Sequence, residues 1–176
     1  MDRKKVQNTV GSIQYDWNNF DFDDFLKQVI QQHGRRITII ETPNLAFGGY
    51  CVSVKQHVYD YIFVNADDHP ISILHNKIHE IGHFLLNHLD SVDIIDSHDE
   101  LRNLMMRFSR LRSYANMTPE LMAEEREAEY FAYLVTQNVA KARRLHELTL
   151  EQESYDWGVP PFYGRFARTK FRRTQE

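Results

Sequence analysis

The chain has 176 residues, a length that favours one domain with a hydrophobic core. A net charge of −4 and a hydrophobic fraction of 42% are ordinary for a soluble globular protein, and they exclude an overall basic footprint for nucleic acid. Cys51 is the only cysteine, which excludes an intramolecular disulfide, and no apolar stretch approaches the ~20 residues that span a membrane. Residues 1–14 lack the apolar segment of a secretory signal, so we expect a cytoplasmic protein.

The first part of the chain predicts a helix followed by a small sheet. Aromatic and aliphatic residues recur at helical spacing over residues 16–32, and Gly34 follows as a stop signal. Three runs rich in β-branched and aromatic residues predict strands over residues 36–41, 49–55 and 60–65. The connections between these strands are short, which favours antiparallel neighbours. This order of elements, with further helices after it, predicts an α+β fold.

The next predicted helix, residues 71–88, contains the sequence HEIGH, which has the form H-E-x-x-H. Residues four apart on a helix point nearly the same way, so His79 and His83 can bind one zinc ion through neutral imidazole nitrogens. Glu80 flanks the pair, where it can take a proton from water at the metal. The motif therefore supplies two metal ligands and a catalytic base.

The same letters could occur by chance in a surface helix with incidental histidines. Two features of the motif helix favour a buried site instead. Ile78, Ile81 and Phe84 belong to an apolar stripe that would pack the helix on a core. Gly82 costs a helix about 1 kcal/mol relative to alanine, which suggests that another part of the chain approaches the helix backbone closely there.

Two more helices and a tail are predicted after the motif. A capping box opens a helix over residues 97–114, and a Thr-Pro pair opens another over residues 118–142. Residues 156–176 interleave basic and aromatic side chains after a pair of prolines. We interpret residues 1–155 as a single domain and residues 156–176 as its tail. Arginines in the 97–114 helix and the tail favour solvated surfaces, and direct nucleic-acid binding through them is the weaker alternative.

The second of these helices carries the predicted third metal ligand. Glu127 is in register with Phe131 and Leu134, and a carboxylate on a buried stripe is costly unless it is paired or binds a metal. The small side chain of Ala128 would let this helix pack closely on the motif helix. Glu127 is therefore the predicted third ligand, with Glu124, one turn earlier, as the alternative.

These segments resemble the ImmA/IrrE metallopeptidases, small cytoplasmic relatives of the thermolysin-like gluzincins. The resemblance rests on the strand that ends at residues 63–65, on the motif helix over residues 78–86, and on EREAEYFA at residues 125–132, which is similar to the family's second motif E-x-E-A-N-x-F-A. The resemblance implies a gluzincin-like arrangement. An N-terminal helix and a small, mostly antiparallel sheet precede the H-E-x-x-H helix, which packs on a second ligand-bearing helix.

By this resemblance, His79, His83 and Glu127 are zinc ligands and Glu80 is the catalytic base of an intracellular endopeptidase. Such proteins act beside a helix-turn-helix repressor of a phage or other mobile element, so the implied activity is site-specific cleavage of that repressor. Glu129 departs from the family's asparagine, which affects the expected substrate more than the expected metal. The alternative is a regulatory binding protein with a peptidase-like fold that acts without cleavage, although such a protein has no need for the base.

The residue that would stabilise negative charge on the substrate stays open among several side chains. His75, one turn before His79, could line the same cleft, although a surface position is the plainer interpretation. The candidates for charge stabilisation are Tyr130, Tyr133, His146, Tyr155 and Tyr163.

Overall fold

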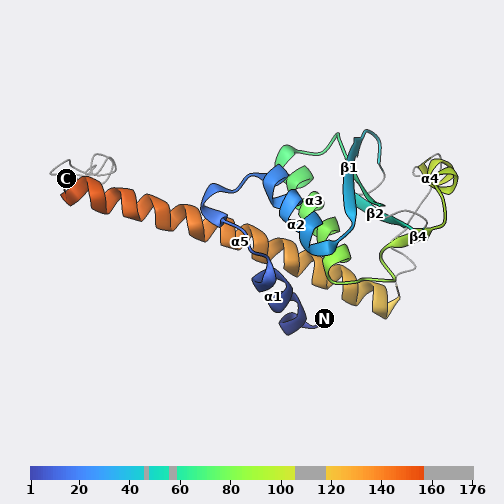
Figure 1. Cartoon of the computed structure of the whole chain (residues 1–176), viewed down its shortest axis with the longest axis horizontal. Helices are drawn as coiled ribbons and strands as arrows, with labels where there is room; N and C mark the ends of the chain where they lie inside the picture. Colours follow the sequence, from blue (N-terminus) through green and yellow to red (C-terminus); the bar gives the residue numbers. More distant parts are fainter. Residues whose placement is uncertain (46–47, 56–58, 106–117, 157–176) are drawn as a thin grey trace, which may run out of the picture.

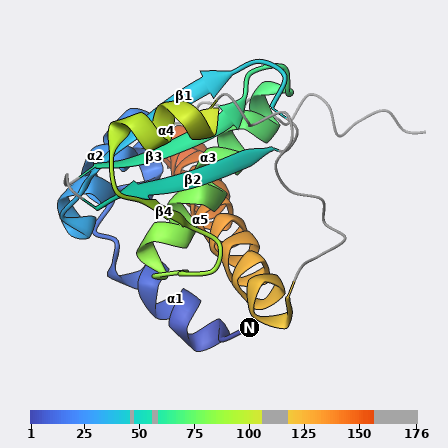
Figure 2. The same ribbon diagram turned by 90° about the vertical axis from the view of Figure 1, so that its right-hand side faces the viewer.

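A computed structural model of the chain describes residues 1–45, 48–55, 59–105 and 118–156. It is an α+β fold in which a small mixed sheet has helices on both faces (Figures 1 and 2). The longest helix, α5 (Pro119–Asp156), lies along α3 (Pro70–Leu85), and its later turns extend away from the sheet (Figure 1). Among the described helices, none combines the length and the apolar composition that crossing a membrane requires.

The chain begins with three short helical segments: α1 (Arg3–Ser12), the 3-10 turn η1 (Trp17–Asn19) and α2 (Phe22–His33). The predicted helix over residues 16–32 is therefore interrupted, and α1 was not expected. The interruption has a capping origin, because the Asp21 side chain accepts a hydrogen bond from the Asp24 amide and starts α2 anew. Gly34 ends α2 in the left-handed conformation, with φ of 75°, as the sequence predicts.

The sheet consists of β1 (Arg36–Thr42), β2 (Gly49–Val54), β3 (Tyr59–Asn65) and the short β4 (Asp93–Ile95). The three predicted strands are confirmed to within one residue at each end. The spatial order is β1-β3-β2-β4, and the expectation of mostly antiparallel pairing is wrong. Only β2 and β3 are antiparallel, whereas β1 pairs with β3 and β2 pairs with β4 in parallel.

The reason for this pairing is the central place of β3. Its residues Ile62, Phe63 and Val64 are all fully buried, which requires cover on both faces of the sheet. β3 is the expected antiparallel partner of β2, but it lies between β2 and β1 in the sheet. The connection from β1 to β2 therefore skips the position of β3, and β1 pairs with β3 in parallel. Chain neighbours are thus not all neighbours in the sheet.

The two faces of the sheet have different cover. Ile62 and Val64 point toward α1, α2, α3 and α5 in the larger core, whereas Tyr50, Phe63 and Leu101 belong to a smaller cluster under α4 (His98–Met105). Residues 106–114 of the predicted 97–114 helix, and the tail beyond residue 156, lie outside the described residues. The 118–142 helix begins as predicted and continues to Asp156.

Helices α3 and α5 pack closely at Gly82. A Cβ atom built on Gly82 would lie 3.0 Å from Cδ1 of Phe131, and Ala128 and Ala132 beside it are fully buried. The prediction that another segment approaches the helix backbone at Gly82 is confirmed. This contact positions the beginning of α5 opposite the histidines of α3.

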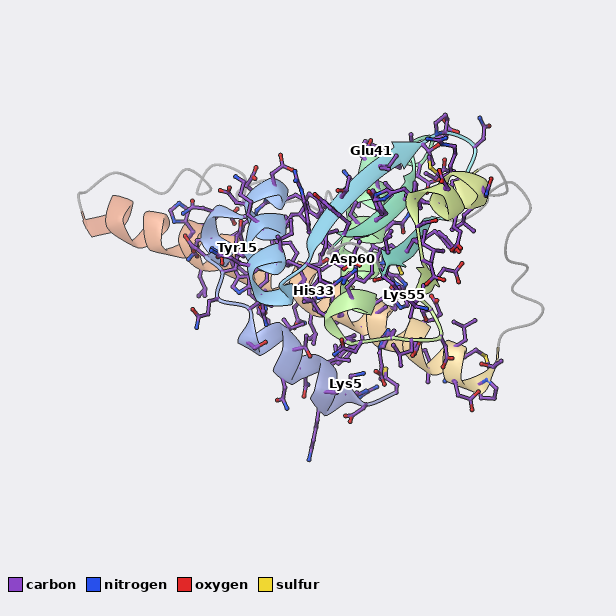
Figure 3. The ribbon with its side chains drawn as sticks, turned by 45° about the vertical axis from the view of Figure 1, so that its right-hand side comes forward. Lys5, Tyr15, His33, Glu41, Lys55 and Asp60 are labelled. Atoms are coloured by element: carbon purple, nitrogen blue, oxygen red, sulfur yellow. The ribbon has the colours of Figure 1, made fainter. Side chains whose placement is uncertain are left out.

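A buried polar cluster around Asp60 joins α2, β2 and β3 with Arg35, which lies between α2 and β1. Figure 3 labels two of its members, Asp60 and His33. The carboxylate accepts hydrogen bonds from Arg35 Nε at 2.9 Å and from Ser53 Oγ at 2.7 Å, and His33 Nε2 lies 2.7 Å from it. Burial raises the pKa of Asp60, but the bonds from His33, Arg35 and Ser53 outweigh burial and leave the pKa below its usual value. Asp60 is therefore a paired structural anion at one end of the sheet.

Candidate metal centre

Helix α3 brings His79 and His83 together, as their four-residue spacing predicts. Their Nε2 atoms are 3.1 Å apart. His83 is almost completely buried, with 1% of its surface exposed, whereas His79 is partly open to solvent. Pro70 occupies the first turn of α3 and His69 caps it, so the helix is well started before the motif. The pair forms one wall of the candidate site.

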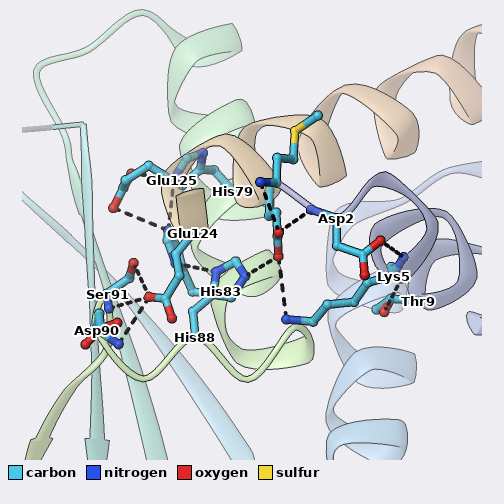
Figure 4. Close-up of polar contacts among 12 residues, drawn as sticks. Asp2, Lys5, Thr9, His79, His83, His88, Asp90, Ser91, Glu124 and Glu125 are labelled. Atoms are coloured by element: carbon cyan, nitrogen blue, oxygen red, sulfur yellow. Dashed lines mark hydrogen bonds and ion pairs between the residues drawn. The ribbon is translucent and has the colours of Figure 1, made fainter. Parts of the chain in front are cut away.

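The carboxylate that faces this pair belongs to Glu125, at the beginning of α5 (Figure 4). Its Oε2 atom lies 3.3 Å from Nε2 of His79, and its Oε1 atom lies 3.8 Å from Nε2 of His83. The donor atoms of these three residues lie within 4.8 Å of one another. Together they form a cluster that could hold a metal ion.

Neither of the two glutamates favoured by the sequence faces the histidine pair in this way. Glu127 Oε2 lies 3.3 Å from Nε2 of His88, and Glu127 Oε1 accepts a hydrogen bond from the Asp2 amide. Glu124 accepts from the amides of Asp90 and Ser91 and fixes the loop after α3. Among the described glutamates of α5, the structure thus brings Glu125, rather than the predicted Glu127 or Glu124, to the His79 and His83 pair.

The difference is one of helical register. The sequence interpretation took the line of Glu127 and Phe131 as the face toward α3. Phe131 does face α3, where it lies against Gly82, and Ala128 and Ala132 beside it are fully buried. The buried face of α5 therefore includes Ala128, and Glu125 lies three residues before Ala128 at one edge of this face. Glu127 lies at the other edge, where Asp2 and Lys5 contact its carboxylate.

Glu80 lies beside the cluster and is buried, with 7% of its surface exposed. Its side chain packs against Gly49 at the beginning of β2, where an added Cβ would collide with the Glu80 carboxylate. Its charge contributes to the raised pKa of His79. The structure therefore places the predicted base next to the histidine pair, and the Gly48-Gly49 pair in the sequence is the signal for the close approach of β2.

The exposed side of the cluster carries a second carboxylate and a third histidine. Glu129 Oε2 lies 3.4 Å from Nδ1 of His79 and 3.0 Å from Nε2 of His75. The hydrogen bond with His79 is the largest influence on the pKa of Glu129 and lowers it. Burial acts in the opposite direction, but with the further bond to His75 the pKa falls to about 2. His75, His79 and Glu129 form a second, more exposed group whose donor atoms are close enough for a metal ion.

The carboxylates around His79 favour a positive charge on its imidazole ring. Burial lowers the pKa of His79, but hydrogen bonds to Glu125 and Glu129 and the charge of Glu80 outweigh burial and raise the pKa to about 10. The carboxylates therefore stabilise a cation at the imidazoles, which a proton supplies in the absence of metal.

A further histidine that the sequence interpretation did not single out lies behind His83. Nδ1 of His88 is 3.0 Å from Nδ1 of His83, and both rings are buried. Burial, partly opposed by the bond to Glu127, lowers the pKa of His88. The motif helix ends at Leu85, and Asn87, with φ of 53°, turns the chain so that the His88 amide donates to the His83 carbonyl. A helix continued to residue 88 would have placed this ring elsewhere, and Asn87 is the signal for the turn.

Two of the candidates for charge stabilisation, Tyr130 and Tyr133, have hydrogen-bond partners outside the histidine cluster. Tyr130 accepts a hydrogen bond from Gln7 of α1, and Tyr133 is half exposed and accepts one from Gln137. His146 is exposed on the extended part of α5. The Tyr155 side chain and Tyr163 lie outside the described residues.

Comparisons of the chain with protein-family models, with curated proteins and with solved structures find no match. The chemistry of the site is therefore argued from its own geometry and charge.

Proposed function

We propose that the protein is a zinc-dependent peptidase with a gluzincin-like site. In this proposal His79, His83 and Glu125 hold the metal and Glu80 is the general base. The proposal is carried by the mutual distances of the three ligand groups, 3.1, 3.3 and 3.8 Å between the named donor atoms. Zinc bonds of about 2.0–2.1 Å in tetrahedral geometry require donors roughly 3.3 Å apart. The set of two imidazoles and one carboxylate is also typical of catalytic zinc, because it leaves one coordination position open.

The chain's own residues divide the work of peptide hydrolysis between them. When zinc is bound, it polarises a carbonyl group and lowers the pKa of water. Glu80 accepts the proton that water loses and passes it to the leaving amine. Its position against Gly49 holds the carboxylate next to the ligands. The partly exposed His79 and Glu125 mark the side from which a substrate enters, because His83 is covered by protein.

The proposed substrate is a protein, specifically a helix-turn-helix repressor encoded beside this chain. This part of the proposal is supported by the resemblance of the two motifs to the ImmA/IrrE metallopeptidases. A peptidase that acts in the cytoplasm, as the composition favours, also requires a narrow substrate range. The competing function is regulation of such a repressor by contact alone, and the buried Glu80 beside the cluster favours cleavage.

The deciding experiment compares the parent protein with Glu80→Gln and with the matched surface variant Glu120→Gln. Glu120 is exposed in the first turn of α5. Purified proteins are analysed for zinc and incubated with the adjacent repressor and, separately, with casein. The parent and Glu120→Gln should bind one zinc ion and cleave the repressor, whereas Glu80→Gln should bind zinc and cleave nothing. A zinc-bound parent that inactivates the repressor without cleaving it would establish the competing function. Rapid digestion of casein would exclude the narrow substrate range.

A further inference from the structure

His88 and Glu127 form a buried line of polar atoms that ends at the proposed ligand His83. Nε2 of His88 lies 3.3 Å from Oε2 of Glu127, and Nδ1 of His88 lies 3.0 Å from Nδ1 of His83. His83 and His88 are 1% and 2% exposed, so water does not compete for these bonds. The other ring nitrogen of His83, Nε2, faces His79. Both ring nitrogens of His83 and both ring nitrogens of His88 therefore face a neighbouring polar atom.

We infer that His88 and Glu127 position His83 for metal binding by fixing which of its ring nitrogens carries the proton. The inference rests on the proposed function, since it assigns a role toward the metal held by His83. His88 and Glu127 are positioning residues in this account, because neither contacts the metal or the substrate.

The direction of the hydrogen bonds follows from a count of protons. Glu127 is a carboxylate and can only accept, so His88 presents Nε2–H to it. A neutral His88 then has a lone pair on Nδ1, which can only accept from Nδ1–H of His83. His83 with its proton on Nδ1 has a lone pair on Nε2, which is the nitrogen that faces His79 and Glu125. The opposite order of protons would direct an N–H at the metal and the His88 lone pair at a carboxylate.

The far end of this hydrogen-bond chain is held by α1. Glu127 accepts from the Asp2 amide, and Lys5 Nζ lies 3.5 Å from its Oε2 atom (Figure 4). Three groups that donate hydrogen bonds or carry positive charge, the Asp2 amide, His88 and Lys5, thus surround the Glu127 carboxylate. This gives Glu127 a reason to be buried without being a ligand.

The first test is the affinity for zinc alone, measured by competition with a chelator. His88→Leu removes the acceptor for His83 and should weaken zinc binding about 10–100-fold, the usual effect of losing a group that orients a ligand. His88→Gln keeps an acceptor and should recover part of this loss. His98→Leu is the matched control, because His98 bonds Tyr61 on the other face of the sheet, and its affinity should equal that of the parent.

The second test uses the zinc-loaded parent and does not depend on any variant folding. With 15N-labelled histidine, NMR should show protonated Nδ1 in His83 and a coupling across the hydrogen bond to Nδ1 of His88. Unprotonated Nδ1 in His83 would overturn the inference. Equal zinc affinities of the parent and a folded His88→Leu would also overturn the inference. The proposed function would still stand in that case, because both proteins would bind zinc. A parent that binds no zinc would overturn both.

Discussion

Two clusters of carboxylates and histidines in this protein differ in the source of their positive charge. In the Asp60 cluster, the carboxylate is neutralised from within the protein, by Arg35 together with His33 and Ser53. In the candidate metal centre, the ion pairs described for Glu125 and Glu129 are all with histidines, whose positive charge depends on a bound proton. The first cluster carries its own fixed cation, whereas the second can exchange a proton for a metal.

This difference distinguishes a polar cluster that stabilises the fold from one that could bind a metal ion. Buried carboxylates and histidines occur in both, so burial alone does not distinguish them. The arrangement of nitrogens does, because two imidazole Nε2 atoms 3.1 Å apart require a proton or a metal between them. Asp60 instead receives donors from three residues and stabilises the fold. Variants in the two clusters should therefore affect different measurements.

The largest effect should come from His83→Ala, which removes a ligand and the end of the hydrogen-bond chain. Two protein ligands do not hold zinc as three do, so stoichiometric zinc binding should be lost. Circular dichroism should show that the helices are retained in the metal-free variant. Metal analysis by mass spectrometry after gel filtration checks the prediction, and a full zinc content in His83→Ala would show that the metal binds elsewhere.

Asp60→Ala should lower the stability of the fold and leave zinc binding unchanged. It leaves Arg35 and His33 without the carboxylate that pairs them in a buried place, which typically costs about 3–5 kcal/mol. Urea unfolding of the zinc-loaded protein measures this loss of unfolding free energy. The folded fraction should still bind one zinc ion. Loss of metal from folded Asp60→Ala would mean that the two clusters are coupled.

A smaller effect should appear in the pH dependence of stability. The pKa of Asp60 is lower in the folded protein than the value of about 3.9 expected in the unfolded chain. Its contribution to stability is therefore complete above the unfolded pKa and is lost as the pH falls through the folded pKa. Between about pH 5 and pH 3, the unfolding free energy of the parent should fall more steeply than that of Asp60→Asn. Parallel curves for the two proteins would contradict the pairing.

The smallest effect should come from His75→Ala, on the exposed side of the metal centre. Glu129 is 61% exposed in its side chain, and water can replace the bond that His75 makes with it. Surface pairs of this kind contribute about 0–1 kcal/mol, so the affinity for zinc should change by less than about tenfold. Competition with a chelator measures it. A loss as large as that of His83→Ala would move the metal to the His75, His79 and Glu129 group.

Local patterns in the sequence were sufficient for much of this account. The H-E-x-x-H spacing and the composition of β1, β2 and β3 depend on residues close in the chain, and each lies where it was predicted. Gly82 even indicated the approach of another segment, which is Phe131. The identity of the metal and the reaction stay predictions.

The failures concern features set by distant parts of the chain. The parallel pairing of β1 depends on β3 lying between β1 and β2, which short connections do not reveal. Which glutamate lies beside the histidine pair depends on how α5 is rotated against α3 and α1. The sequence favoured Glu127 or Glu124, whereas Glu125 is the one that faces His79. His88 reached His83 through the turn at Asn87, after the end of the helix that the motif predicted.

The proposed function requires a zinc ion between His79, His83 and Glu125. A crystal structure of the zinc-soaked protein, with diffraction recorded on both sides of the zinc absorption edge, would locate this ion. We expect one strong anomalous peak about 2.0–2.2 Å from Nε2 of both histidines and from the Glu125 carboxylate. A peak bound by Glu127, or no peak at the histidine pair, would show that the proposed site is wrong.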